Sequence, residues 1–301
     1  MQFKRVKRPV HGVLLLDKPF GYSSNQALQK VRWLFQAAKA GHTGSLDPMA
    51  TGLLPLCLGE ATKFSHFMLD ADKCYRANIR LGSTTTTGDA EGEVLRTRPV
   101  EVTTEQLERV LAQFTGEIDQ VPPMYSALKH DGKALYEYAR AGIDIPRESR
   151  RISIYRMTLE QFEADHIQLV VECSKGTYIR TLAEDIGEAL GCGAHLIGLR
   201  RLFSGHLHLR DAVTIEQLEA LTLEARDNAL LPVEATIQHL PALELDADSS
   251  FYLQQGQAVW KSGLTEAGPF RLYTEAGEFI GTGVQTEDGK LAPKRLLVRD
   301  H

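Results

Sequence analysis

The chain has 301 residues, of which 43% are hydrophobic and 24% are charged. This is the composition of an ordinary soluble globular protein, and the length leaves room for a substantial core and more than one domain. No apolar run is long enough to span a membrane, and the run Val13–Leu16 after the basic first residues is too short for a signal peptide. We therefore expect a cytoplasmic protein with no membrane partner.

The net charge of −5 argues against a nucleic-acid partner when it is taken alone, because phosphates attract positive surfaces. The charges are nevertheless unevenly distributed. Residues 1–40 hold eight Lys or Arg and one acid, and residues 216–250 hold eight acids and one Arg. A further basic cluster consists of Arg147, Arg150, Arg151 and Arg156. The chain is thus polarised and is able to offer RNA one basic face. The alternative is that these charges only keep it soluble.

Hydrophobic periodicity predicts strands and helices in alternation. Strand segments alternate apolar and polar side chains, as where Tyr75, Ala77, Ile79 and Leu81 fall on one face. Helical segments repeat apolar residues every three or four positions, and the first follows the N-cap cluster Ser23–Asn25. The predicted strands are 10–16, 74–81, 152–159 and 167–173, and the predicted helices are 25–40, 60–69, 178–190, one that opens at 103–105 and one that opens at 213–216.

Two stretches depart from this pattern. Residues 128–150 are rich in Lys, Arg, Gly and Asp and offer few core candidates, so we expect a mobile excursion with a short helix at 134–141. Beyond Leu240-Pro241 the chain changes to short alternating runs separated by glycine, one of them at 258–260. That change is typical of a small all-β domain.

The cysteines and histidines give no indication of a metal site. Four cysteines, Cys57, Cys74, Cys173 and Cys192, are scattered without Cys-x-x-Cys spacing. They suit reduced, partly buried thiols better than disulfides or a zinc site. His42 likewise has no His, Cys or carboxylate at ligand spacing, so we expect no bound metal.

The most informative segment is Gly41–Gly52, with the sequence Gly-His-Thr-Gly-Ser-Leu-Asp-Pro-Met-Ala-Thr-Gly. Its glycines and proline disfavour a helix or a long strand, so we expect a shaped loop. Pro48 restricts Asp47 to extended conformations, and a carboxylate held in this way can be aimed as a nucleophile or a general base. The alternative is a glycine-rich connection whose Asp47 caps the next element.

This loop closely resembles the catalytic loop of the pseudouridine synthases, in the form carried by the TruB family, whose bacterial members modify uridine 55 in the T-loop of tRNA. Four further segments fit the same family in order, over residues 10–210. The resemblance implies an α+β fold in which a mixed, largely antiparallel central sheet is flanked by helices. It also implies a catalytic domain at 1–240 and a small C-terminal all-β barrel, similar to an RNA-binding PUA domain, at 241–301. The four segments are Asp17–Ser24, Lys73–Arg76, Gln120–Ala127 and Cys173–Arg180.

The reaction of that family breaks the N1–C1′ bond of a uridine, turns the uracil and joins C5 to C1′, so no cofactor is required. The resemblance implies that Asp47 attacks C1′, attacks C6 or assists loss of the 2′ proton, on a base taken out of its stack. A carboxylate in a dry pocket takes up a proton unless a cation stands beside it. In the family the arginine at the position of Arg180 is that cation. Arg180 lies near the start of a helix, where the helix dipole gives a cation no help, so we expect its partner to be anionic.

The resemblance gives further roles to residues that also have an ordinary structural interpretation. Tyr75 would stack on the uracil and help to remove the C5 proton, although its strand face equally suits a core aromatic. Tyr178 would contact the base, His42 would pack against RNA bases displaced when the loop opens, and Leu199 would line the uracil site. Weaker expectations, contact with phosphate or support of the site, fall on cations that are surface residues by default: Lys18, Lys129, Arg147, Arg150 and Arg151.

Three hypotheses follow: an RNA-modifying isomerase, a tRNA-binding or tRNA-folding module without essential catalysis, and a hydrolase that uses Asp47. A hydrolase needs a second carboxylate or a metal, and none stands near the motifs. Asp47, Tyr75 and Arg180 together argue against a pure binding module. We therefore predict an enzyme that converts uridine 55 in the T-stem-loop of tRNA. Long extensions typical of relatives that work in protein complexes are absent, so we expect a monomer with no obligatory protein partner.

Overall fold

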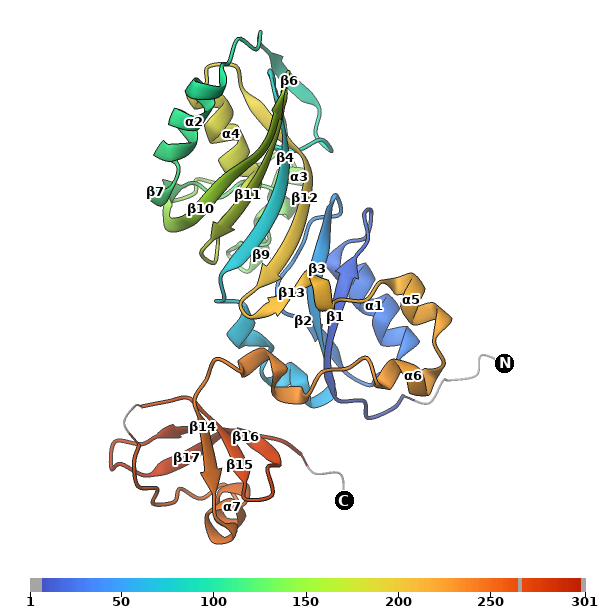
Figure 1. The fold of residues 1–301 in the computed structure, drawn as a ribbon, viewed down its shortest axis with the longest axis vertical. Helices are drawn as coiled ribbons and strands as arrows, with labels where there is room; N and C mark the ends of the chain where they lie inside the picture. Colours follow the sequence, from blue (N-terminus) through green and yellow to red (C-terminus); the bar gives the residue numbers. More distant parts are fainter. Residues whose placement is uncertain (1–6, 265–266, 299–301) are drawn as a thin grey trace.

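The computed structural model describes residues 7–264 and 267–298, so the basic residues Lys4 and Arg5 lie outside the described part. A large sheet with its helices stands above a small second sheet (Figure 1). The large sheet has nine strands, two of them short side branches. Its main path runs through β1 (Gly12–Lys18), β3 (Ala50–Leu58), β12 (Ala194–Ser204), β4 (Lys73–Leu81), β11 (His166–Cys173), β10 (Arg150–Glu163) and β7 (Gly116–Gln120), with β2 (Ala40–His42) beside β3 and β13 (Leu207–His208) beside β12.

The large sheet is mixed, as predicted. Strands β3 and β12 run parallel to each other, and the other neighbours on the main path are antiparallel. The single parallel pair matters for the site. It places the strand that follows the Gly41–Gly52 loop directly beside β12, and β12 in turn pairs with β4.

The two faces of the sheet differ in polarity. On β4 the residues Tyr75, Ala77, Ile79 and Leu81 are buried, as their alternation predicts. Helices α2 (Thr104–Gln113) and α4 (Ile179–Ala189) contribute to the same hydrophobic core as these residues and cover that inner face (Figure 1). The outer face carries polar pairs such as Arg76 Nε–Glu160 Oε2 at 2.7 Å. An antiparallel sheet with one packed face and one solvated face needs this division.

Helix α1 (Ser24–Leu34) begins where the sequence predicts and ends earlier. The Ser23 side chain accepts a hydrogen bond from the Gln26 backbone N–H, and Gln26 Oε1 accepts one from the Ser23 backbone N–H, which satisfies two free donors of the first turn. The prediction of a helix as far as residue 40 was wrong, because Gln36 takes a left-handed conformation with φ 53° and reverses the chain. Helices α5 (Ile215–Ala220) and α6 (Leu223–Asp227) lie beside α1 (Figure 1).

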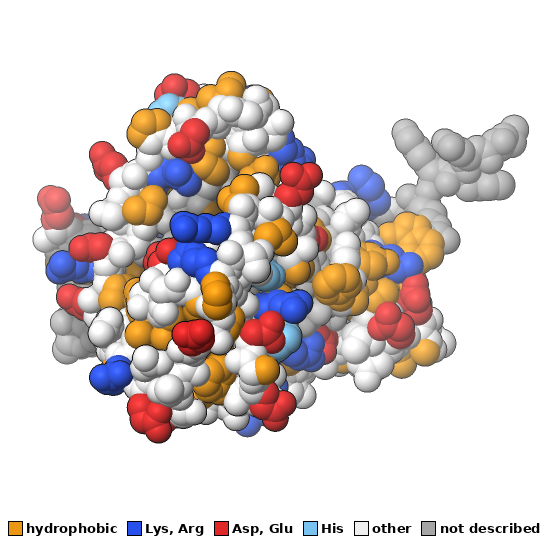
Figure 2. Space-filling model, turned by 90° about the horizontal axis from the view of Figure 1, so that it is seen from above, with side chains coloured by type: hydrophobic (Ala, Val, Ile, Leu, Met, Phe, Trp, Pro, Cys, Tyr) orange, Lys and Arg blue, Asp and Glu red, His pale blue; other side chains and the backbone are white. Residues whose placement is uncertain are grey.

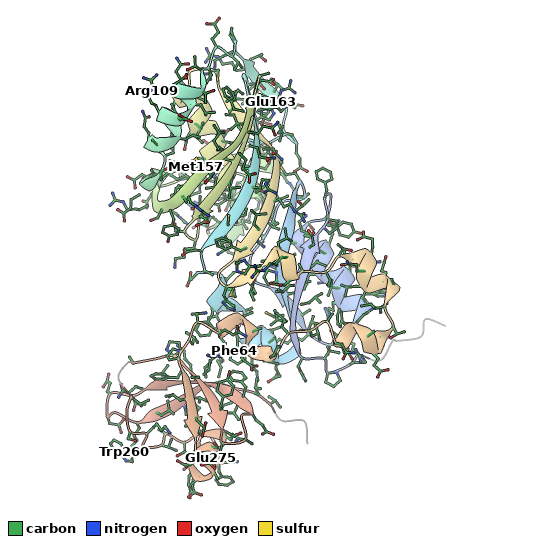
Figure 3. The ribbon with its side chains drawn as sticks, viewed as in Figure 1. Phe64, Arg109, Met157, Glu163, Trp260 and Glu275 are labelled. Atoms are coloured by element: carbon green, nitrogen blue, oxygen red, sulfur yellow. The ribbon has the colours of Figure 1, made fainter. Side chains whose placement is uncertain are left out.

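The predicted helix at 60–69 consists instead of two 3₁₀ turns, η1 (Gly59–Lys63) and η2 (Ser65–Met68). These turns contact the second sheet. Lys63 Nζ donates to the Leu296 carbonyl at 2.8 Å, and the Val298 N–H donates to Glu60 Oε2 at 2.7 Å. Phe64 lies at this junction (Figure 3), and its ring meets that of Phe279 edge-on at 5.5 Å.

The C-terminal part is a small sheet with one helix, so the prediction of an all-β region was wrong. Helix α7 (Ala247–Gln254) is capped by Asp246, whose carboxylate accepts the Ser249 N–H at 2.7 Å. The predicted run at 258–260 contributes only an isolated bridge between Val259 and Leu291. The sheet runs in the order β14 (Ala242–Leu245), β15 (Phe270–Thr274), β16 (Phe279–Gln285) and β17 (Leu291–Leu296).

The remaining segments are short connections. The predicted helix at 134–141 is present as α3 (Leu135–Arg140), after the hairpin of β8 (Lys129–His130) and β9 (Lys133–Ala134). Arg150 pairs with Gln120 in the sheet, so Arg150 and Arg151 belong to β10 rather than to the excursion. The others are β5 (Ser83–Thr85), β6 (Val94–Thr97), η3 (Leu209–Asp211) and η4 (Val233–Ile237).

Candidate active site

Asp47 stands on a loop between β2 and β3 whose backbone is held on both sides. The Leu46 N–H donates to Ser24 Oγ at 2.7 Å, and the hydroxyl of Ser24 donates back to the Leu46 carbonyl at 3.0 Å. The Pro48 carbonyl accepts the Gly21 N–H at 2.9 Å, and the Asp47 carbonyl accepts the Ala50 N–H at 3.0 Å. The Asp47 side chain remains 44% exposed. The loop therefore presents a fixed carboxylate that an external molecule can reach.

Arg180 holds the inner side of this carboxylate. Its side chain is 6% exposed, and its Nε lies 3.1 Å from Asp47 Oδ2. On the other side, Nη1 lies 3.6 Å from Oδ2 of Asp89, which is 4% exposed. The remaining donors reach backbone carbonyls, those of Thr87 at 3.1 Å and Tyr125 at 2.6 Å. One buried guanidinium thus has two anionic neighbours, whereas a single anionic partner was predicted.

Asp89 was not recognised in the sequence. It lies in the polar turn after β5, where its Oδ1 accepts the Thr87 hydroxyl at 2.6 Å and the Glu91 N–H at 3.0 Å. The available signal was an acid next to Gly88 in a turn, the same kind of setting that drew attention to Asp47. Because such turns are common on protein surfaces, the pattern did not predict burial.

The environment sets the charge of Asp47 through opposing effects. Burial raises the pKa of the Asp47 carboxyl, the Arg180 guanidinium lowers it, the nearby Asp89 raises it and Lys18 lowers it, with a net rise. Burial raises the pKa even though the carboxylate is partly exposed, because protein atoms replace much of the water around it. Arg180 therefore opposes the protonation that burial and Asp89 favour.

Tyr75 is on the inner face of β4 and is 9% exposed. In the register of the sheet it lies opposite Val171 on β11 and Arg201 on β12. Burial raises the pKa of its phenol, Arg201 opposes the rise, and Asp47 adds to it. The phenol is therefore close enough to feel both the carboxylate on the loop and the guanidinium on the neighbouring strand.

The comparison with curated proteins identifies the family. The chain is 65% identical to the tRNA pseudouridine synthase B of Methylobacillus flagellatus over 99% of this chain and 98% of that one. It is 53% identical to the tRNA pseudouridine synthase B of Pseudomonas aeruginosa, over 98% of this chain and 99% of that one. The chain belongs to the TruB family of pseudouridine synthases.

Family models and solved structures agree with this assignment. The N-terminal domain model of the TruB family pseudouridylate synthases matches residues 32–179, and two C-terminal models of tRNA pseudouridylate synthase B and pseudouridine synthase II TruB match residues 180–238 and 241–297. A chain in the crystal structure of a Cbf5-Nop10-Gar1 complex superposes with a TM-score of 0.72 at 26% identity, over 94% of this chain and 83% of that one. The archaeal box H/ACA Nop10-Cbf5 complex shares the fold, with a TM-score of 0.70 at 23% identity over 98% and 93% of the two chains.

The other residues singled out for base contact in this TruB-family chain lie around the same centre. Tyr178 caps α4 two residues before Arg180, and its backbone is held by the Gln120 side chain through bonds of 2.8 and 3.1 Å. Leu199 on β12 pairs with Ala50, just beyond the Asp47 loop, and with Ala77 on β4. The sheet therefore brings the loop, β4 and β12 together.

His42 lies on β2 at the start of the loop, opposite Leu56. Burial and the positive charge of Arg201 lower the pKa of its imidazole. Its Nδ1 is buried and has no hydrogen-bond partner in the part of the chain that the structure describes. A neutral ring of this kind is suited to packing against a flat partner.

Lys18 lies under the loop and supports it, and its contact with phosphate stays a prediction. It is fully buried, and its Nζ donates to the carbonyls of Pro19 at 2.9 Å, Tyr22 at 2.5 Å and Pro48 at 3.5 Å. Burial lowers the pKa of its ammonium to about 8. Lys18 thus ties the first motif of the chain to the residue that follows Asp47.

The proposed RNA-contacting cations are not gathered at Asp47. Lys129 is exposed on the β8–β9 hairpin. Arg147 donates to the Pro122 carbonyl at 3.3 Å and lies 3.3 Å from Asp144 Oδ1. Arg151 is 69% exposed and lies between Glu117 and Asp119, at 3.6 and 3.8 Å. Arg150 affects the pKa of the Tyr178 phenol and so lies nearer to the centre.

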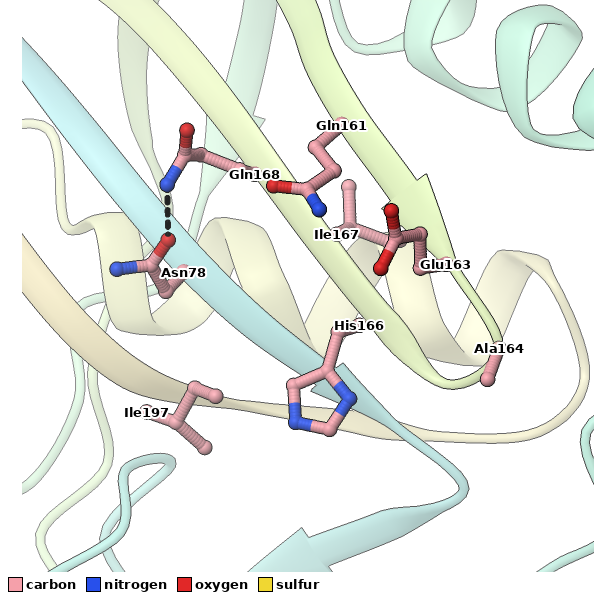
Figure 4. Close-up of a pocket in the computed structure, with 8 residues that line it drawn as sticks. All are labelled: Asn78, Gln161, Glu163, Ala164, His166, Ile167, Gln168 and Ile197. Carbon is pink, nitrogen blue, oxygen red and sulfur yellow. Dashed lines mark hydrogen bonds between the residues drawn. The ribbon is translucent and has the colours of Figure 1, made fainter.

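No group of His, Cys, Asp or Glu able to hold a metal ion occurs in residues 7–264 and 267–298, and the cysteines are free and buried. Within the same residues no helix is long and apolar enough to cross a bilayer. A hollow of about 490 Å³ opens on the outer face of the sheet, where Gln168 Nε2 donates to Asn78 Oδ1 at 2.8 Å (Figure 4). None of the predicted site residues lines it.

Proposed function

We propose that this pseudouridine synthase acts on uridine 55 in the T-loop of tRNA, with Asp47 as its nucleophile. The observation that carries the proposal is the pair of Asp47 and Arg180 at 3.1 Å, in which the guanidinium is 6% exposed and the carboxylate 44% exposed. A buried cation keeps the carboxylate charged, and the open side of the carboxylate leaves room for a nucleotide. The tRNA substrate is that named for the relatives with 65% and 53% identity.

The chemistry assigned to Asp47 is electrostatic and covalent. The carboxylate meets the sugar carbon or the uracil ring as the N1–C1′ bond breaks, and its negative charge stabilises the electron-poor centre that results. Arg180 favours that charge, because it opposes the effects of burial and of Asp89 on the pKa of the Asp47 carboxyl. No redox partner takes part, since bonds are exchanged within one nucleotide.

The aromatic and apolar residues around Asp47 hold the displaced base in this proposal. Tyr75 stacks on the uracil and its phenol participates in removal of the C5 proton, while Leu199 forms an apolar wall. Tyr178 contacts the base from the start of α4, and His42 packs against neighbouring bases of the opened loop. Support comes from the backbone pairings that bring β3, β4 and β12 to one point.

The rest of the chain serves recognition of the T-stem-loop. We assign residues 1–240 to catalysis, with 128–150 as an RNA-contacting insertion, and 241–301 to a PUA-like RNA-binding domain that acts in a monomer. In the view of Figure 2, Lys, Arg and His side chains gather around the middle of the face, with Asp and Glu among them. Such a face offers phosphate contacts in spite of the net charge of −5.

The test is pseudouridine mapping on an unmodified tRNA transcript, with the protein and its Asp47→Asn variant. We expect pseudouridine at position 55 with the protein, and a loss of turnover of more than about 10³-fold with the variant, whose tRNA affinity should stay within about threefold. Pseudouridine at another position would contradict the T-loop assignment. Turnover by Asp47→Asn near the original level would contradict the nucleophile and favour a tRNA-folding role without essential catalysis.

A further inference from the structure

Arg201 is a buried guanidinium without an anionic partner. It is 2% exposed and is among the largest fully buried side chains of the protein. Its Nε donates to the Leu53 carbonyl at 2.7 Å, whereas its Nη2 is buried and has no hydrogen-bond partner among the described residues. Within residues 7–264 and 267–298 no carboxylate lies at ion-pair distance from it, in contrast to Arg180 with Asp47 and Asp89.

The neighbouring Arg200 shows the usual environment of an arginine, which is paired with a carboxylate and partly exposed. Its Nη2 lies 2.6 Å from Asp17 Oδ2, and its Nη1 donates to the Thr51 hydroxyl at 3.3 Å, with 38% of the side chain exposed. Consecutive strand residues point to opposite faces, so Arg200 faces outward and Arg201 faces inward. The inward guanidinium carries a charge that its surroundings do not neutralise.

The groups around Arg201 increase the cost of that charge. The positive charge of Arg201 lowers the pKa of Lys18, of His42 and of Lys73, each of which is also desolvated. A buried, unpaired cation among other cations is strongly unfavourable for folding. Such costs persist mainly where the reaction requires them.

The sheet register identifies what Arg201 faces. It is paired with Tyr75 on β4 and with Gly52 on β3, so its side chain lies on the inner face. There it acts on the Tyr75 phenol through charge and a side-chain hydrogen bond, and its Nη1 would lie 3.8 Å from a Cβ at Gly44 in the Asp47 loop. Gly52 ends the motif Gly41–Gly52, and a Cβ there would lie 2.4 Å from the Arg201 carbonyl oxygen. The last glycine of the catalytic loop is therefore required for β12 to approach and bring Arg201 to this place.

We propose that Arg201 is a positioning residue for Tyr75. The buried guanidinium of Arg201 fixes the Tyr75 phenol and stabilises the negative charge on the phenol oxygen before this oxygen takes the C5 proton. The proposal rests on the role assigned to Tyr75 in the proposed function. In the step, the phenol has first released its proton to water. The C5–H bond then breaks, its electron pair returns to the uracil ring, and the proton joins the phenolate oxygen. Arg201 supplies the charge that makes the phenolate accessible, and Tyr75 makes the contact with the base.

The electrostatic environment of the phenol agrees with this assignment. The groups that act on Tyr75 are Arg201, Cys173 and Asp47, and of these Arg201 lowers the pKa of the phenol, whereas the other two raise it together with burial. Removal of the guanidinium should therefore raise the pKa of Tyr75 further. Neutralising Arg200, on the opposite face, should not.

A double-mutant cycle tests the catalytic part. Arg201→Met keeps much of the side-chain volume, and because it removes an unpaired buried charge it should unfold within a few degrees of the original temperature. We expect single-turnover pseudouridine formation to fall by about 30-fold in Arg201→Met, and by less than about twofold when the same change is made in a Tyr75→Phe protein. Arg201→Lys, which keeps the charge, should fall less than Arg201→Met. The tRNA affinity of each should stay within about twofold.

Equal effects of Arg201→Met in the two backgrounds would overturn the proposal, since Arg201 would then act independently of the phenol. A Tyr75→Phe protein with original turnover would overturn it as well, and would remove the role of Tyr75 from the proposed function while leaving that of Asp47. The Asp47→Asn result thus separates a failure of the active-site assignment from a failure of the inference.

A second measurement does not depend on turnover. The protein is labelled with tyrosine carrying ¹³C at Cζ, and the Tyr75 resonance is assigned by its absence in Tyr75→Phe. Arg201→Met should shift the titration of this resonance to higher pH, whereas Arg200→Met should leave it in place. An unchanged Tyr75 titration in a folded Arg201→Met protein would overturn the proposal.

Discussion

The Asp47 centre and the segment 121–149 are neighbours with opposite physical properties. They are joined by the bond from Arg180 Nη2 to the Tyr125 carbonyl at 2.6 Å. At the centre, Arg180 and Asp89 are 6% and 4% exposed, and the loop backbone around Asp47 is bonded on both sides. Within residues 121–149, all of which are described, only Pro122, Ser126 and Leu135 are buried.

This difference separates the demands of chemistry from those of access. A reacting carboxylate has to be held within a fraction of an ångström by groups that are themselves fixed. A segment that admits a folded RNA and covers an extracted base needs low local stability, so that it can rearrange at small cost. If the segment 121–149 contacts the RNA as proposed, its few buried contacts serve the reaction as the many contacts at Asp47 do.

Removal of Arg180 should disrupt the rigid Asp47 centre most severely. In Arg180→Met, Asp47 protonates more readily and Asp89 is left buried without its cation. We expect turnover to fall by more than about 10³-fold and the free energy of unfolding to fall by about 3–5 kcal/mol. Single-turnover assays and urea unfolding measure the two effects.

A second variant separates the loss of turnover from the loss of stability. Adding Asp89→Asn to Arg180→Met removes the second uncompensated charge and should restore much of the stability without restoring turnover. Recovery of turnover together with stability would mean that Arg180 serves the fold alone.

The role of the segment 121–149 is tested by replacing residues 130–146 with a short Gly/Ser link. Because this segment contributes little to the core, unfolding of the remainder should be unchanged, whereas kcat/KM on tRNA should fall by about 10²-fold. In the intact protein, amide exchange at 128–149 should be fast when free and slow with tRNA bound. Full activity of the replaced protein, or exchange that tRNA does not alter, would show an ordinary surface loop.

Glu184 is a further acid beside Arg180, and it makes the stability of the Asp47 centre depend on pH. Burial raises the pKa of its carboxyl to about 7 from an ordinary 4.5, with Asp185 adding to the rise. The folded state therefore disfavours the carboxylate. This penalty is absent below about pH 4.5, grows as the pH rises and is complete above about 7.

Glu184→Gln should accordingly raise the free energy of unfolding at pH 8 by on the order of 1 kcal/mol, allowing for solvent screening of this partly exposed group, and should have no effect at pH 4. Glu188 on the same helix provides the control, since the Arg98 guanidinium lowers the pKa of its carboxyl. Glu188→Gln should not stabilise at pH 8. A gain from Glu184→Gln that is equal at both pH values would contradict the assignment.

The smallest expected effect concerns phosphate contacts beside the segment. Changing Arg150 and Arg151 to Gln should lower the slope of log Kd against log salt for tRNA by up to about two, and by less if Glu117 and Asp119 retain Arg151. Arg8 is the control: its guanidinium binds Asp227 at 2.7 and 2.9 Å, so Arg8→Gln should leave the slope unchanged. Titrations at several salt concentrations decide, and a larger change for Arg8→Gln would place the RNA elsewhere.

Local signals in the sequence predicted local structure well. The Ser23 cap, the alternation of β4 and the start of α4 after Tyr178 were all legible, because each depends on neighbours a few residues away. The N-cap signal of α7 was also present in Asp246 and Ser249 and was passed over, since the alternating runs around it favoured strands. The extent of the helix at 25–40 failed for another reason, because Gln36 gave no sign of a left-handed turn.

The sequence alone predicted the Asp47 loop, its resemblance to a family of enzymes and the faces of the main strands and helices. The electrostatics of the site became visible only in the folded structure. Asp89 meets Arg180 across 91 positions of the chain, and Arg201 meets Tyr75 and Gly52 through strand pairing. A side chain's burial and its charged neighbours are properties of packing, which no window of the sequence contains. For that reason Lys18 was expected to be a surface cation and Asp89 was not recognised, although both lie in the interior.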